Sequence, residues 1–125
     1  MNREIKFRGK TATVDGQNWV YGHYTRVESF FDDKKKDYIE VIKNNHMQDY
    51  AVIEDTVGQY TGLKDKNGVE IYEGDILEDR YSDDRATVEW SDEDAMFVLI
   101  SDNVQTDFSK ESSTWWEVVG NIYDK

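Results

Sequence analysis

Hydrophobic and polar residues alternate in short runs along most of the chain, and the hydrophobic positions are rich in β-branched and aromatic side chains. Short alternating runs bounded by turn residues are typical of β-strands, whereas an amphipathic helix repeats every three to four residues. Helix signals are weak, and one turn near residues 108–113 is the best candidate. The pattern predicts an all-β protein with strands at residues 5–14, 19–30, 38–42, 50–53, 57–61, 69–72, 76–80, 85–90, 96–100 and 116–123.

Turn residues separate the predicted strands and divide them into two lobes. Asp15-Gly16 lies between the first two strands, and Asp65-Lys66-Asn67-Gly68 forms a later hairpin turn. Gly68 tolerates the left-handed backbone that such a turn needs, so we expect it to have a positive φ. We predict a small antiparallel sheet in residues 1–53, followed in residues 54–125 by short, regularly spaced strands that are typical of a small barrel or sandwich.

The charge of the chain is unevenly distributed. The net charge is −12, with residues 1–53 holding nine Lys and Arg against eight Asp and Glu, and residues 54–125 holding six against nineteen. A surface as negative as the second lobe repels nucleic-acid phosphates, so we expect no binding to duplex nucleic acid. The hydrophobic content of 38% and aromatic content of 14% are too high for this charge to imply disorder.

Targeting and redox signals are absent from the sequence. There is no cysteine, which excludes disulfides, thiolate zinc sites and cysteine nucleophiles. The first ten residues carry charges where a secretory signal would be apolar, and the longest apolar run, residues 95–100, is only long enough for a strand. We therefore expect a cytoplasmic protein that does not interact with a membrane.

Catalytic and metal-binding patterns are also missing. The two histidines, His23 and His46, lack the helical i, i+4 relation of a zinc motif, and neither is paired in sequence with a nucleophile. A calcium loop needs a glutamate six positions after its glycine, but Gly74 stands six positions after Gly68. No phosphate-binding glycine loop is present. We predict a protein that is not an enzyme and has no cofactor or metal.

Several stretches are more specific than these general patterns. They are residues 5–10 (IKFRGK), 19–22 (WVYG), 56–68 (TVGQYTGLKDKNG), 70–76 (EIYEGDI), 88–90 (VEW) and 119–123 (VGNIY). Taken together they closely resemble the YopX family of phage and prophage proteins over the whole length of the chain. The resemblance implies an all-β protein whose C-terminal part is a small SH3-like barrel, and it implies no assigned reaction and no catalytic residue.

The central stretch has a structural interpretation and a functional alternative. Its glycines lie where strands must turn or bulge, and its large side chains, among them Tyr60 and Leu63, can fill a small barrel. In the alternative, Tyr60 or the lysines Lys64 and Lys66 face a partner.

Acidic turns and an aromatic pair give the leading functional hypothesis. We predict a non-enzymatic accessory protein that contacts an unidentified protein, either a host factor or a second copy of itself. Its sharper form is DNA mimicry, in which carboxylates on a rigid β scaffold replace phosphates. Trp115 and Trp116 must point to opposite faces if extended, which leaves one indole for the surface. The candidate contact residues are Asp83, Asp84, Asp92, Glu93, Asp94, Trp115 and Tyr60.

A rival hypothesis is binding of single-stranded nucleic acid through the N-terminal lobe, because small barrels can stack bases on aromatic side chains. The period of two along residues 19–24 places Trp19 and Tyr21 on one face and Tyr24 on the other. A metal-dependent or hydrolytic enzyme is the third and weakest alternative. The residues that the nucleic-acid hypothesis would use are Arg3, Lys6, Arg8, Lys10, Lys34, Lys35 and Lys36 beside Trp19, Tyr21 and Tyr24.

Overall fold

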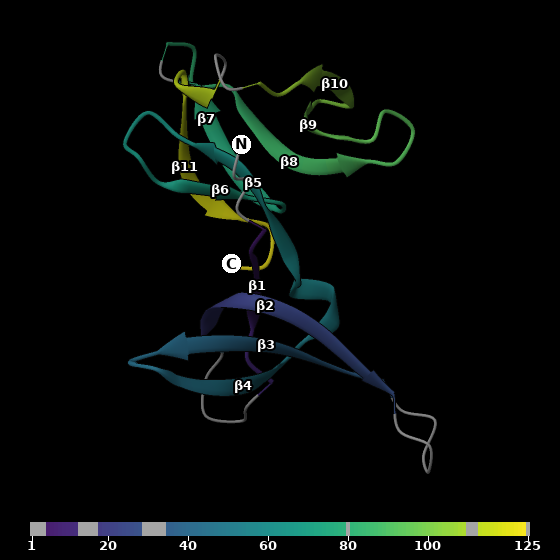
Figure 1. Cartoon of the computed structure of the whole chain (residues 1–125). Helices are drawn as coiled ribbons and strands as arrows, with labels where there is room; N and C mark the ends of the chain where they lie inside the picture. Colours follow the sequence, from purple (N-terminus) through teal and green to yellow (C-terminus); the bar gives the residue numbers. More distant parts are fainter. Residues whose placement is uncertain (1–4, 13–17, 29–34, 80, 110–112, 125) are drawn as a thin grey trace. The chain divides into compact units, whose positions relative to one another are not determined.

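A computed structural model describes residues 5–12, 18–28, 35–79, 81–109 and 113–124, and within them the all-β prediction is confirmed (Figure 1). The predicted turn at Asp15-Gly16 and residues 110–112 of the predicted helical turn at 108–113 lie outside the described residues. The Ser113 backbone N–H donates to the Ser109 carbonyl oxygen at 2.9 Å, as in one turn of helix. The described residues form a short 3-10 helix, η1 (Glu54–Thr56), and the strands β1 (Phe7–Lys10), β2 (Trp19–Glu28), β3 (Lys35–Lys43), β4 (His46–Val52), β5 (Gly58–Lys64), β6 (Glu70–Tyr72), β7 (Asp75–Asp79), β8 (Arg85–Ser91), β9 (Met96–Ser101), β10 (Val104–Asp107) and β11 (Trp116–Asn121).

Packing divides the chain into one unit of residues 1–59 and another of residues 60–125. The sequence predicts this boundary after residue 53. Residues 54–59 belong with the first unit because the Lys10 backbone N–H donates to Thr56 Oγ1 at 2.9 Å. In addition, the start of β5 pairs with β1, with Gly58 opposite Arg8. The first unit therefore includes η1 and the first two residues of β5.

The first unit is an antiparallel sheet in the order β4-β3-β2-β1, followed by the start of β5 (Figure 1). Its inner face carries Phe7, Tyr24, Ile39 and Val52, and Ile39 is fully buried. The β3–β4 hairpin turns at Asn44 and Asn45, which both have positive φ. Two such residues are typical of a tight hairpin turn.

The second unit contains the end of β5 paired with β6, and a five-stranded antiparallel sheet in the order β10-β9-β8-β7-β11. Gly68 has φ of 80°, which confirms the expected left-handed turn. No pairing joins β10 to β11 within the described residues, so the strands do not close the expected barrel, and an SH3-like arrangement stays a prediction. The core of this unit consists of Ile71, Leu77, Ala86, Val88, Phe97, Leu99 and Phe108, with Leu63, Trp116 and Val118 packed against it.

Candidate functional site

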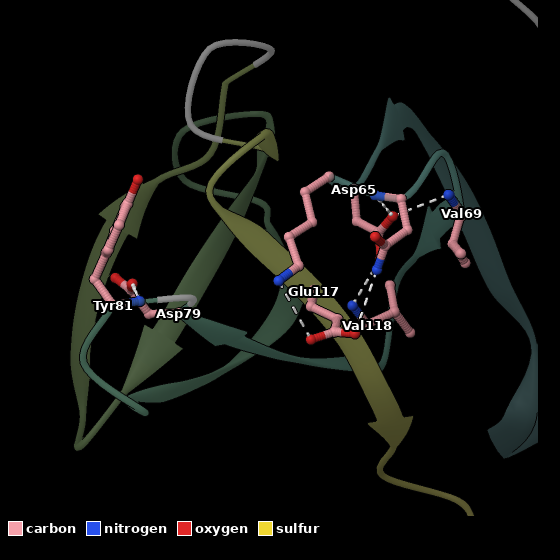
Figure 2. A network of polar contacts seen from close by, with 8 residues as sticks. Asp65, Val69, Asp79, Tyr81, Glu117 and Val118 are labelled. Carbon is pink, nitrogen blue, oxygen red and sulfur yellow. Dashed lines mark hydrogen bonds and ion pairs between the residues drawn. The ribbon is translucent and has the colours of Figure 1, made fainter.

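The central motif of the chain, residues 56–68, ends in a buried carboxylate that organises the second unit. Asp65 is 5% exposed, and its Oδ1 accepts hydrogen bonds from the backbone N–H groups of Asn67 at 2.8 Å and Val69 at 2.9 Å. Its Oδ2 accepts from the N–H of Val118 on β11 at 2.9 Å (Figure 2). One side chain thus closes the hairpin turn and fastens it to a strand 53 residues away.

The neighbouring motif positions have similar structural roles. Tyr60 is 5% exposed, and its ring packs on that of Tyr72 with centroids 5.4 Å apart. The ammonium of Lys66 lies 3.6 Å from the carboxylate of Glu117 on β11. Gly74 has φ of 91°, and a Cβ there would lie 2.9 Å from the ring of Tyr123. These contacts favour the structural interpretation of the motif, and Tyr60 does not offer a surface to a partner.

The five acidic candidate residues are not brought together. Asp83 and Asp84 lie in the turn before β8, and the group Asp92–Asp94 lies in the turn after it. At about 3.3 Å per residue, these turns are roughly 25 Å apart along the strand. The sheet therefore presents two separate acidic turns and not one continuous acidic surface.

The second acidic turn is also engaged in holding the sheet together. Asp92 Oδ1 accepts a hydrogen bond of 2.9 Å from the indole Nε1 of Trp90. Asp94 Oδ2 accepts one of 2.7 Å from Gln105 Nε2 on β10. Both carboxylates have local structural partners, which explains their presence without a ligand.

The Trp115-Trp116 pair divides as the sequence predicts. Trp116 begins β11 and packs against the core of the second unit, whereas Trp115 is 58% exposed in the turn before that strand. Trp115 is therefore available to a partner, as a single exposed side chain.

A second buried carboxylate, Asp37, lies on the inner face of the first unit. It accepts hydrogen bonds from the Tyr24 hydroxyl and, at 3.1 Å, from Arg26 Nε, while the Arg26 guanidinium also donates to Glu54. Burial, and then the hydrogen bond to Asp37, raise the pKa of Tyr24 above its ordinary value. The hydrogen bonds to Glu54 and Asp37 likewise raise the pKa of Arg26. This network joins β2, β3 and η1 by charge-assisted hydrogen bonds.

Replacing the hydroxyl in this network gives a pH-dependent prediction. We expect Tyr24→Phe to lower the free energy of unfolding by about 1 kcal/mol at pH 7. The pKa of Tyr24 is higher in the folded state than in the unfolded state. The stabilisation by its hydroxyl is therefore fully present below pH of about 10, and it is lost as the pH rises through the folded-state pKa. Urea unfolding at pH 7 and at higher pH measures the difference. Tyr38→Phe, which removes a hydroxyl with no hydrogen-bond partner in the described residues, is the control. A Tyr24→Phe effect that is the same at both pH values would contradict this assignment.

The N-terminal residues of the nucleic-acid hypothesis are split between the two faces of the sheet. Register places Arg8 and Lys10 on the outer face with Tyr21 and Trp19, while Tyr24 lies on the inner face. The Arg8 guanidinium carbon lies 4.5 Å from the centroid of the Trp19 ring, and Lys10 Nζ lies 5.6 Å from it. The indole is thus already in contact with cations of its own chain. Arg3, Lys34 and the side chain of Lys35 lie outside the described part of the structure.

Large apolar side chains are exposed on this outer face, a feature that no local pattern in the sequence predicts. Tyr21 and Val27 come from β2, Ile42 from β3 and Met47 from β4, with Met47 directly opposite Ile42. Their exposed fractions range from 46% for Tyr21 to 67% for Met47. Figure 1 shows the three strands side by side. We call these four residues and the half-buried Tyr38 of β3 the outer-face patch. The register places the Glu40–Asp49 pair between its two parts, with Ile42 and Met47 on one side and Tyr38 and Val27 on the other.

A shallow hollow of about 390 Å³ opens on the same face. It is lined by Thr25, Val27, Tyr38, Glu40 and Asp49, which come from three adjacent strands. Both carboxylates lie at one side of the hollow because Glu40 and Asp49 are directly opposite each other in the β3–β4 pairing.

The described residues offer neither a metal-binding cluster nor a membrane-spanning helix. They contain no group of three or more His, Asp or Glu side chains placed to hold a metal ion. His23 is exposed on β2 and His46 is exposed at the start of β4, so the two histidines lie on different strands. None of the helical segments described is long and apolar enough to cross a bilayer.

Comparison with known proteins identifies the family. The family model described as YopX protein matches residues 6–125. The crystal structure of protein EF1440 from Enterococcus faecalis is similar, with a TM-score of 0.58 and 21% sequence identity over 97% of this chain and 94% of that one. At that identity the similarity concerns the fold alone. None of the curated proteins compared with the chain matches it. The match over nearly the whole chain shows that this protein belongs to the YopX family.

Proposed function

We propose that this protein is a phage or prophage accessory protein that acts in the bacterial cytoplasm by binding another protein and catalyses no reaction. The observation that carries the proposal is the outer-face patch. Soluble proteins rarely gather several large, half-exposed apolar side chains on one solvent-facing surface unless that surface makes a contact. In a sheet with one face buried, the solvent face is normally polar, so Ile42 and Met47 are costly there without a partner.

Charge supports a partner with a basic surface. Residues 60–125 hold seventeen Asp and Glu against six Lys and Arg. Such a net charge attracts a basic protein over long range and raises its rate of association more than its affinity. The acidic turns at Asp83-Asp84 and Asp92–Asp94 would serve this attraction, with Trp115 as an additional exposed contact.

DNA mimicry is a second form of the same function. It is less well supported, because a mimic needs its carboxylates in a continuous row, whereas these turns lie at opposite ends of β8. Binding of single-stranded nucleic acid has still less support. The ring of Trp19 already contacts Arg8 and Lys10, and the carboxylates of Glu40 and Asp49 on the same face would repel phosphates.

Site-specific photo-cross-linking in bacterial cells tests the proposal. A benzophenone amino acid replaces Met47, at the edge of the outer-face patch, and in a matched control it replaces Val104, which is similarly exposed on β10. We expect ultraviolet light to give a discrete protein adduct from position 47 that survives nuclease treatment. An adduct that nuclease removes would support the nucleic-acid hypothesis and overturn this one.

A further inference from the structure

We infer that the hollow on the outer face of the first unit is an anchor pocket for a basic side chain, an arginine above all, presented by an extended apolar segment of the partner protein. This inference rests on the proposed function and specifies which partner chemistry the outer-face patch accepts. Five residues of one sheet face line this hollow: Thr25, Val27, Tyr38, Glu40 and Asp49.

The carboxylate pair requires an explanation within the fold. Glu40 and Asp49 are directly opposite each other on adjacent strands, where side-chain Cβ atoms are about 5 Å apart and like charges destabilise the sheet. In the described part of the chain neither carboxylate has a hydrogen-bond or ion-pair partner. The outer-face cations Arg8 and Lys10 are on β1, two strands from Glu40, and Lys36 is four residues along β3. His23 lies opposite Glu40 on β2. A cation bound between the two carboxylates would offset their repulsion.

The walls of the hollow determine which cation fits. Val27 and Tyr38 provide apolar surface beside the carboxylates, which suits the methylene stem of a long basic side chain. The planar guanidinium of arginine can make hydrogen bonds to both carboxylates and can stack on the Tyr38 ring. The volume of about 390 Å³ exceeds that of one water molecule many times over, so a whole side chain can enter. Ile42 and Met47 form the next pair on this face beyond Glu40 and Asp49, and they would receive an apolar residue that flanks the arginine.

Titration with a defined peptide tests this inference. The probe is acetyl-Val-Arg-Val-amide, and its matched control is the same peptide with citrulline, which keeps the shape of arginine but has no charge. Amide resonances of the full chain, recorded during the titration, should shift saturably at residues lining the hollow. We expect the citrulline peptide to bind at least about tenfold more weakly, because a charge-assisted pair is lost.

Variants of the chain complete the test. Combined Glu40→Gln and Asp49→Asn substitutions should weaken arginine-peptide binding at least about tenfold, while the thermal midpoint of the free protein stays the same or rises as the repulsion is removed. Combined Asp83→Asn and Asp84→Asn substitutions make the same change of charge elsewhere and should leave binding unaltered. Equal binding of the two peptides, or equal loss in the two double variants, would overturn the anchor pocket. A cross-link from position 47 would still support the proposed function in that case.

Discussion

Asp65→Ala is expected to lower the free energy of unfolding by about 4 kcal/mol, because three backbone N–H groups lose a charged acceptor at about 1–2 kcal/mol each. Those donors belong to Asn67, Val69 and Val118, so the loss opens the hairpin turn and also detaches it from β11. Urea unfolding followed by tryptophan fluorescence measures the effect. Three of the four tryptophans, Trp90, Trp115 and Trp116, lie in the second unit and report on it.

Two further variants separate the hydrogen bonds from the change of charge. Asp65→Asn keeps one carbonyl oxygen, which can still accept from the turn N–H groups of Asn67 and Val69, but it has no second acceptor for the N–H of Val118. We therefore expect it to lower the free energy of unfolding by about half as much as Asp65→Ala. Asp107→Ala removes an exposed carboxylate from β10 and should cost about 0.5 kcal/mol or less. A similar loss for Asp65→Ala and Asp107→Ala would show that Asp65 does not have the structural role assigned to it.

Gly22→Ala is the second substitution with a large expected effect. A Cβ at this position would lie 2.0 Å from the backbone carbonyl oxygen of Glu40 on β3. No side-chain rotation relieves that overlap, so β2 and β3 must separate locally, and we expect a loss of about 3 kcal/mol. The unfolding midpoint, together with the amide resonances of β2 and β3, measures it.

Gly120→Ala is the matched control for Gly22→Ala. Gly120 also lies in a strand, β11, but a Cβ there meets nothing within 4 Å. Its loss should stay below about 1 kcal/mol, in the range of glycine-to-alanine changes without strain. If Gly22→Ala were equally mild, the close approach of β2 to β3 would be wrong.

Much of the fold could be predicted because alternating side chains in an antiparallel sheet leave a period of two in the sequence. The missed strand, β10, has little of this signal, since Val104 is its one large apolar residue. The turn before β10 does contain a sequence signal, the pair Asp102-Asn103. Both residues have the positive φ of a tight hairpin turn. β3 begins at Lys35, before the strand predicted at residues 38–42, because Asp37 is polar and its burial depends on Tyr24 and Arg26 of another strand.

The candidate surfaces were harder to predict than the strands. The separation of the two acidic turns follows from the strand predicted between them, so the sequence contained that information. The outer-face patch depends on the register of β2, β3 and β4, which brings Val27 and Met47 to one face although they are twenty positions apart. No local pattern specifies that register, because the contacts that fix it lie between strands. The pairing of Glu40 with Asp49 across β3 and β4 could not be predicted from the sequence for the same reason.

The most direct test of the central claim, contact through the outer face of the first unit, is the ratio of cross-linked product from position 47 to that from position 104. Both native side chains are more than 60% exposed, so accessibility alone predicts a ratio near one. Contact through the outer-face patch predicts a ratio of at least about ten for one discrete protein adduct, since benzophenone reacts only with groups it touches, and Ile42→Asp beside it should abolish that adduct. Equal products from the two positions, or an adduct from position 104 or 115 alone, would contradict the account and move the contact surface to the second unit.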